Sequence, residues 1–86
     1  MEKLIIKSAK LHGVDPSIAL AVAECESSFK PMAKNKNSTA IGVYQFLSKT
    51  WEYIGSPGNR LDARDNINAF MVHYPKNPEW WEECNK

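Results

Sequence analysis

The densest group of chemically reactive side chains lies in residues 23–29, with the sequence Ala-Glu-Cys-Glu-Ser-Ser-Phe. This stretch holds two carboxyl groups, a thiol and two hydroxyls. A positioned carboxyl group can serve an enzyme as a general acid or base. Whether Glu24 or Glu26 could do so depends on how the helix that carries them faces the core.

A helical wheel separates the two glutamates. With about 3.6 residues per turn, Val22, Cys25 and Phe29 all fall in one sector, within about 40° of Ile18. We predict that this sector is buried. Glu26 lies at its margin, whereas Glu24 falls among positions that face solvent. Partial burial would raise the pKa of Glu26 toward the range useful for a general acid. The alternative is that both carboxylates are simply solvated, as most glutamates on helices are.

Length and composition predict one ordinary globular domain over residues 1–86. A chain of this size buries only about 60–65% of its unfolded surface, so its core is modest. Eleven basic and ten acidic residues give a net charge of +1. The basic residues form no stripe, so we expect no nucleic-acid or membrane-surface partner, and we expect a monomer. The sequence offers neither a membrane span nor a signal peptide, so we expect a cytosolic chain or one trimmed to its mature domain.

The two cysteines leave two alternatives open. A bridge between Cys25 and Cys84 would close a loop of about 60 residues and contribute about 4 kcal/mol, which suits a small secreted domain. Two unrelated thiols, with Cys25 a plain core residue, fit the sequence equally well. A zinc site is poorly supported, because His12 and His73 lack ligand spacing to either cysteine. We therefore expect no metal and no other cofactor.

Apolar periodicity and turn residues predict a mainly α fold. We expect helices over Glu2–His12, from Pro16 to about Phe29, from the cap Ser48 to Gly55, and from the cap Asp62 to Pro75, with a last turn after Asn77. The polar, turn-rich residues 32–40 could form a short β-hairpin-like loop.

Gln45 is a polar side chain inside the apolar run 40–47. An amide in such a run must find hydrogen-bond partners. It either bonds neighbouring backbone, or it faces a cleft and recognises a polar ligand such as an acetamido sugar. No acidic residue occurs between Glu26 and Glu52.

Several segments resemble the soluble lytic transglycosylase domain of the lysozyme superfamily. They are Gly13–Phe29, Gly42–Phe46 before Thr50-Trp51, and Asp62–Ile67. The most specific pieces are Glu-Ser-Ser-Phe and the following Gly-x-x-Gln. The Cys-Glu-Ser form and the tryptophan-rich end look particularly like the short variants related to resuscitation-promoting factors. The resemblance implies a small lysozyme-like helical domain, stapled by a Cys25–Cys84 disulfide, that works in the cell envelope or outside the cell.

The same resemblance implies roles for individual residues. Glu26 corresponds to the family's catalytic acid, Ser27 to the hydroxyl beside it, and Gln45 to the amide that contacts N-acetyl sugars. Larger members carry a C-terminal Ala-Tyr-Asn-Ala-Gly segment whose tyrosine supports the acid, and this sequence lacks it. Tyr44 and Tyr74 are the candidate substitutes and candidate substrate contacts.

The resemblance implies an enzyme that cleaves the β-1,4 bond between N-acetylmuramic acid and N-acetylglucosamine in peptidoglycan and leaves a 1,6-anhydromuramic acid end. The acid-free loop after Glu26 fits this one-carboxyl route, because hydrolysis ordinarily takes two carboxyls. One alternative is a muramidase, since Asp62 and Asp65 on a later helix could fold near the cleft. Others are a glycan-binding module without turnover and a purely structural helical domain.

Overall fold

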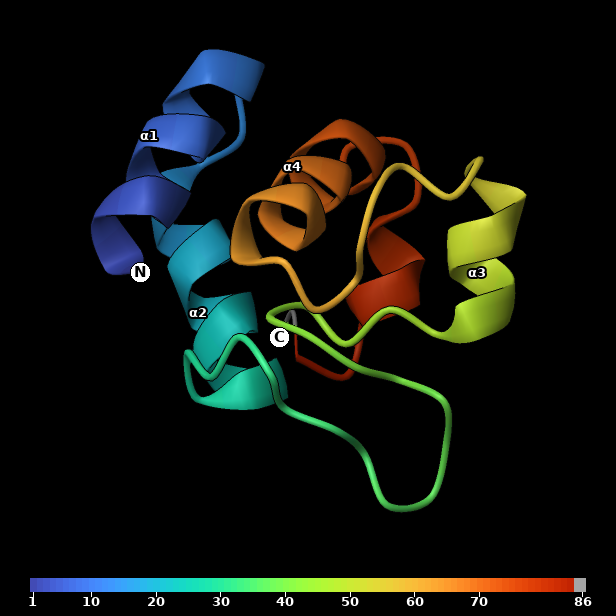
Figure 1. Ribbon diagram of the computed structural model, residues 1–86. Coiled ribbons are helices and arrows are strands. Elements are labelled where there is room, and N and C mark those ends of the chain that lie inside the picture. The colour runs from blue at the N-terminus through green and yellow to red at the C-terminus, as the bar shows by residue number, and fades with distance from the viewer. Residues whose placement is uncertain (85–86) are drawn as a thin grey trace.

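Four α-helices and one 3-10 turn make up the regular structure of residues 1–84, which the computed structural model describes. They are α1 (Glu2–His12), α2 (Pro16–Ser27), α3 (Ser48–Tyr53), α4 (Ala63–His73) and η1 (Pro78–Trp81). Figure 1 shows α1 and α2 along one side, α4 across the centre and α3 on the opposite side. The predicted mainly α fold is confirmed. None of these helices has the length and apolar character needed to cross a bilayer.

Local capping residues set the boundaries of α1 and α2, as predicted. Gly13 ends α1 in the left-handed region, at φ 70°, where its N–H reaches the carbonyl of Ala9. Asp15 begins α2, since its side chain accepts a hydrogen bond of 2.8 Å from the N–H of Ser17. Proline follows at the first helical position, where its missing N–H costs nothing.

The end of α2 and its buried face differ from the prediction. The helix ends at Ser27 rather than near Phe29, because Ser28 and Phe29 adopt left-handed backbone conformations, with φ of 52° and 61°. The prediction that Cys25 lies on the buried stripe is wrong, because its side chain is exposed. The buried face of α2 consists of Ala19, Val22, Ala23 and Ser27. The buried hydroxyl of Tyr44 donates to the carbonyl of Ala19 at 2.8 Å, so the core packs against this face and not against the sector of Cys25.

The start of α3 is capped over a long range instead of locally. Ser48, predicted as the cap, is the first helical residue, and Leu47 occupies the cap position without a side-chain bond. The N–H of Ser48 donates to Oγ1 of Thr39 at 3.0 Å. By contrast, Asp62 caps α4 as predicted, accepting from the N–H of Asp65.

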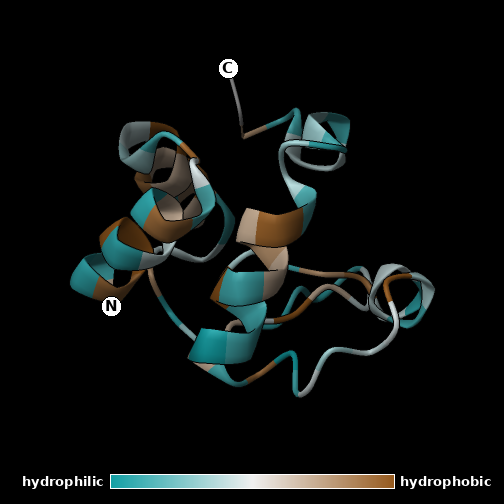
Figure 2. Cartoon of the chain, turned by 90° about the horizontal axis from the view of Figure 1, so that it is seen from above, coloured by the Kyte–Doolittle hydropathy of each residue, from teal (hydrophilic) through white to brown (hydrophobic). Residues whose placement is uncertain are grey.

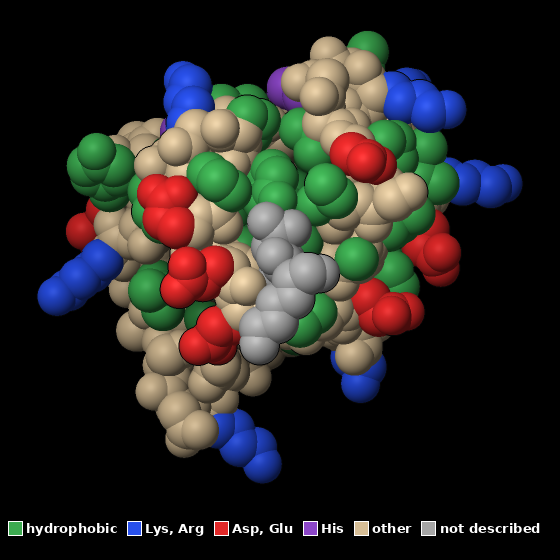
Figure 3. All heavy atoms as spheres, turned by 180° about the vertical axis from the view of Figure 1, so that it is seen from behind, with side chains coloured by type: hydrophobic (Ala, Val, Ile, Leu, Met, Phe, Trp, Pro, Cys, Tyr) green, Lys and Arg blue, Asp and Glu red, His purple; other side chains and the backbone are tan. Residues whose placement is uncertain are grey.

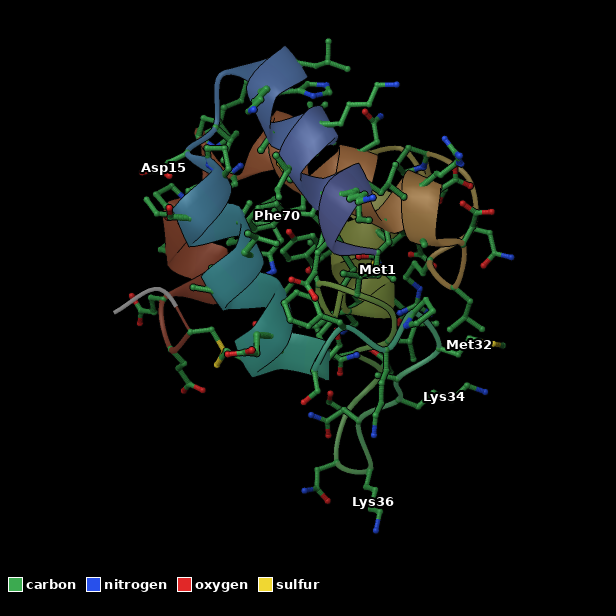
Figure 4. All side chains as sticks on the ribbon, turned by 90° about the vertical axis from the view of Figure 1, so that its left-hand side faces the viewer. Met1, Asp15, Met32, Lys34, Lys36 and Phe70 are labelled. Carbon is green, nitrogen blue, oxygen red and sulfur yellow. A yellow bond between two sulfur atoms is a disulfide. The ribbon has the colours of Figure 1, made fainter. Side chains whose placement is uncertain are left out.

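Aromatic rings fill the centre of the core. Tyr44 and Phe70 stack with their ring centroids 3.7 Å apart, and Trp81 meets the edge of Phe70 at 4.8 Å. The indole N–H of Trp81 also donates to the backbone carbonyl of Tyr44 at 2.8 Å, which docks η1 onto the core. Figure 4 shows Phe70 in the interior, beside α2. In Figure 2, hydrophobic and hydrophilic residues alternate around the helices, as expected when each helix buries one face.

The predicted hairpin-like loop is present without strands in the described residues. It consists of isolated antiparallel bridges, one between Lys34 and Ile41 and one between Ile41 and Phe46. The N–H of Asn35 donates to the carbonyl of Ala40 at 3.0 Å and closes the turn between them. In Figure 1 this loop extends from the end of α2 across the lower part of the molecule.

Two side chains from the α4 region fix the segment that carries Gln45. The buried Asn66 accepts from the N–H of Tyr44 at 2.8 Å and donates to the carbonyl of Arg60 at 2.8 Å. The guanidinium of Arg60 donates to two backbone carbonyls of the same loop, at 2.7 and 2.8 Å. Gly42, at φ 91°, lies so close to Asn66 that an added Cβ would overlap its amide. The backbone on both sides of Gln45 is therefore held firmly.

Candidate active site

A groove runs between the loop after α2 and the C-terminal turn. It consists of three adjoining hollows of about 570, 240 and 190 Å³. The largest, which we call the loop end, is lined by Glu26, Gln45 and residues of the segment 27–37. The second is lined by Glu26 and by residues 79–83, which we call the C-terminal wall. The third lies between Gln45, Trp80 and the start of α3. Glu26 and Gln45 thus stand where the hollows meet.

Glu26 occupies the last turn of α2 and is half-buried, as predicted, whereas Glu24 is exposed. Burial removes part of the hydration of the Glu26 carboxylate, and the negative charge of Glu83 repels it. Together they raise the pKa of Glu26 from 4.5 to about 6. A carboxyl with this pKa can both donate and accept a proton near neutral pH.

A disulfide joins Cys25 to Cys84, with Cα atoms 5.6 Å apart. The bridge that the family resemblance implied is therefore confirmed. Glu26 follows Cys25 in the chain and Glu83 precedes Cys84. The bridge thus brings the ends of α2 and of the C-terminal wall together and places Glu83 close enough to affect the pKa of Glu26.

The acidic residues of the C-terminal wall are the part of the groove that sequence reasoning missed. Glu79, Glu82 and Glu83 line the same hollow as Glu26. Figure 3, seen from the side opposite Figure 1, shows several acidic side chains lying near one another on that face. The signal that could have found them is the implied disulfide itself, because it ties this acidic segment to the residue next to Glu26.

Asp62 and Asp65, the acids predicted as possible neighbours of the cleft, lie elsewhere. The side chain of Asp62 caps α4 by accepting a hydrogen bond from the N–H of Asp65. The side chain of Asp65 accepts a hydrogen bond of 3.0 Å from the N–H of Asn59. Neither lines the groove. The expectation that they would fold near the cleft is wrong, because both carboxylates hold the turn before α4 in place.

Gln45 does both of the things that its sequence context allowed: its side chain bonds to neighbouring backbone, and the residue also faces the groove. Its Nε2 donates to the backbone carbonyls of Ala33 and Gly42, at 3.1 and 2.8 Å, and so ties the two sides of the loop together. The residue also lines two of the three hollows. Because a glutamine amide has two N–H donors, a ligand in the groove would meet the acceptor Oε1.

The remaining predicted site residues lie at different depths. Ser27 lines the loop end, but its buried hydroxyl donates to the carbonyl of Ala23 at 3.2 Å. Tyr44 is fully buried in the core, where its hydroxyl donates to the carbonyl of Ala19 at 2.8 Å. Tyr74 is half-buried against other aromatic rings. The structure brings neither tyrosine to the groove, because both supply rings to the core instead.

The backbone beside the groove is unusually strained. Of the four non-glycine residues with positive φ in the described chain, Ser28 and Gln45 line the loop end, and Phe29 follows Ser28 in the chain. Such conformations cost on the order of 1 kcal/mol or more each and gather at functional sites. Across residues 1–84, no cluster of three or more His, Cys, Asp or Glu side chains could hold a metal ion.

Comparisons with known proteins identify the family to which this chain is similar. A family model described as the transglycosylase SLT domain matches residues 3–71. The membrane-bound lytic murein transglycosylase C of Yersinia pestis (strain Pestoides F) is 33% identical over 76 residues, which covers 70% of this chain and 21% of the relative. The protein of the same description from Actinobacillus pleuropneumoniae serotype 5b (strain L20) is 40% identical over 47 residues, covering 55% of this chain and 13% of the relative. The chain thus spans about one fifth or less of the length of these relatives.

Proposed function

The chain belongs to the transglycosylase SLT domain family, and we propose that it cleaves the glycan strands of peptidoglycan, with Glu26 as its catalytic acid. One observation carries the proposal: a half-buried carboxyl with a pKa raised to about 6 lines two adjoining hollows of the groove. The relatives named as lytic murein transglycosylases support the same substrate.

The proposed reaction uses one carboxyl twice. Glu26 gives its proton to the glycosidic oxygen while the bond from that oxygen to C1 of the muramic acid breaks. The departing N-acetylglucosamine leaves with a hydroxyl. The 6-hydroxyl oxygen of the muramic acid then bonds to C1, and its proton returns to the Glu26 carboxylate. A 1,6-anhydro ring results and Glu26 is again protonated, so a pKa near 6 suits both steps.

The walls of the groove suggest how the sugars are held. Oε1 of Gln45 is an acceptor, so it suits the N–H of an acetamido group. Trp80 is 36% exposed and Leu47 is 44% exposed at the third hollow, where they offer apolar surface to a sugar ring. Ser27 contributes less, because its hydroxyl proton is already committed to the helix backbone.

Hydrolysis of the same bond is a second candidate, and the C-terminal wall favours it. Glu79, Glu82 and Glu83 supply carboxylates in the hollow that Glu26 lines. A second carboxylate that activates water would make the protein a muramidase. The two reactions differ in their product, since only the transglycosylase route omits water.

The deciding experiment is mass spectrometry of purified peptidoglycan digested with the protein. We expect muropeptides with 1,6-anhydro ends, and reducing ends alone would select hydrolysis. Glu26→Gln should lower the rate by at least about a thousandfold, and Glu24→Gln, an exposed change on the same helix, should not. Cleavage retained in Glu26→Gln contradicts the assignment. Oligosaccharide binding without cleavage by the unchanged protein would instead indicate a binding module.

We also propose that the protein acts in the cell envelope or outside the cell, and as a monomer. A structural disulfide suits an oxidising compartment. Alkylation of the native protein under non-reducing conditions should leave Cys25 and Cys84 unmodified, and modification of both would contradict this location.

A further inference from the structure

The groove carries opposite charges on its two sides. Its loop end is lined by Lys30, Lys34 and Lys36. Its C-terminal wall is lined by three glutamates. Residues 27–51 contain no acidic residue, so no carboxylate within this segment neutralises the three lysines. The net charge of the protein is only +1, so the groove is not lined by an excess of one charge. Instead, positive and negative side chains lie on opposite sides of it.

The lysines extend from a loop whose backbone is held in place. Lys34 pairs with Ile41 in an antiparallel bridge, and the amide of Gln45 donates to the carbonyl just before Lys34. Figure 4 shows Lys34 on the loop and Lys36 farther out, at its tip. Both side chains are exposed. Two cations therefore stand at the loop end of the groove, in the hollow that is also lined by Gln45, the residue that we expect to meet the acetamido group.

The proposed ligand carries charged groups that could respond to the opposite charges on the two sides of the groove. The backbone sugars of peptidoglycan are neutral where the lactyl groups of muramic acid are joined to peptides. The anionic groups of such a strand are the carboxylates of those peptide stems. A stem attached to a sugar near Gln45 would meet lysines on one side of the groove and glutamates on the other. Attraction by the lysines and repulsion by the glutamates would both direct the stem carboxylates toward the loop end.

We propose that Lys34 and Lys36 bind the carboxylates of the peptide stems, so that the protein recognises peptide-bearing glycan by its charge as well as by its sugars. This inference rests on the proposed function for the identity of the ligand. It adds a charge-recognition site at the loop end of the groove, and it sets the direction in which the strand lies.

A binding experiment tests the proposal without relying on turnover. Calorimetry would compare two soluble disaccharide peptides that differ only in their stem carboxylates, free in one and converted to amides in the other. Glu26→Gln serves as the background, so neither ligand is cleaved. We expect the free carboxylates to bind about threefold to tenfold more tightly at low salt, the range for two exposed ion pairs. In about 0.5 M salt most of this difference should disappear.

Variants locate the effect. Lys34→Ala with Lys36→Ala should remove the preference for free carboxylates while leaving affinity for the amidated ligand unchanged. The matched control is Lys3→Ala with Lys7→Ala, which removes the same charge from α1, where both residues line a separate hollow. The control should retain the preference. Equal affinities for the two ligands, or a preference that survives Lys34→Ala with Lys36→Ala, would overturn the proposal.

The two claims can fail separately. If the unchanged protein cleaves peptidoglycan but binds both ligands equally, the stem site is refuted and the function stands. If it cleaves nothing yet prefers free carboxylates through Lys34 and Lys36, the function is refuted and the stem site stands.

Discussion

The two sides of the groove are built by different means. The loop end is lined by an irregular, basic segment to which Gln45 donates a hydrogen bond, and Gln45 itself belongs to the neighbouring residues 39–46, which Asn66 and Arg60 hold in place. The C-terminal wall is a short, acidic turn held by a disulfide and by the docked ring of Trp81. Glu26 lies between them; burial is the main cause of its raised pKa, and the wall adds the negative charge of Glu83. The comparison separates two sources of charge at the groove: the wall supplies carboxylates beside Glu26, and the loop end supplies lysines.

Removing the disulfide should affect the wall most strongly. Cys25→Ser with Cys84→Ser opens a cross-link between residues 59 positions apart, which should lower the free energy of unfolding by about 4 kcal/mol. Denaturant unfolding measures the loss, and the unchanged protein under strong reductant should show a similar one. A variant as stable as the parent would mean that Trp81 alone holds the wall.

Removing Asn66 should affect the loop end. In Asn66→Ala, the buried N–H of Tyr44 loses its acceptor, so the free energy of unfolding should fall by about 2 kcal/mol. Asn68→Ala, on the exposed side of the same helix, is the matched control and should change little. Equal effects of the two changes would show that the loop does not depend on this hydrogen bond.

The charge of Glu26 should have a smaller, pH-dependent effect on stability. Because folding raises its pKa, its favourable contribution is present below pH 4.5 and is lost as the pH rises through about 6. Glutamine does not titrate, so Glu26→Gln should gain stability relative to the parent between pH 4.5 and 7. The gain should be no more than about 1 kcal/mol, because the half-exposed carboxylate is screened by solvent. Thermal unfolding at the two pH values checks this, and a pH-independent difference would contradict it.

The smallest expected effect isolates the wall's influence on the acid. Glu83→Gln removes the second cause of the raised pKa of Glu26 and leaves burial, the first cause, in place. Activity should fall as the pH rises above the pKa of Glu26, and removing the charge of Glu83 should move this fall to lower pH. The pH profile of kcat/KM measures the shift. An unchanged profile would show that the wall does not adjust the acid.

Sequence reasoning succeeded where the cause was local. Asp15 and Gly13 fixed helix boundaries through their own side-chain or backbone properties, and the margin position of Glu26 followed from helix geometry alone. The disulfide came from the family resemblance instead. Neither Glu26 as the acid nor the anhydro product is tested by these observations, and both stay predictions.

Sequence reasoning failed where contacts with residues distant in the chain determine the position of a side chain. Cys25 was expected inside because the wheel could not show which face of α2 the core would cover. Tyr44 looked like a groove residue because its sequence position adjoins Gln45, yet its ring stacks on Phe70. The glutamates of the wall lie more than fifty positions from Glu26, and only the folded chain reveals that they share a hollow.

The bridge between Cys25 and Cys84 also makes the groove depend on where the protein is. In a reducing compartment the two sulfurs would stay thiols, and the turn that carries Glu83 would lack its covalent attachment to α2. After transfer to an oxidising compartment, closing the bridge would complete the wall and the surroundings of the acid together.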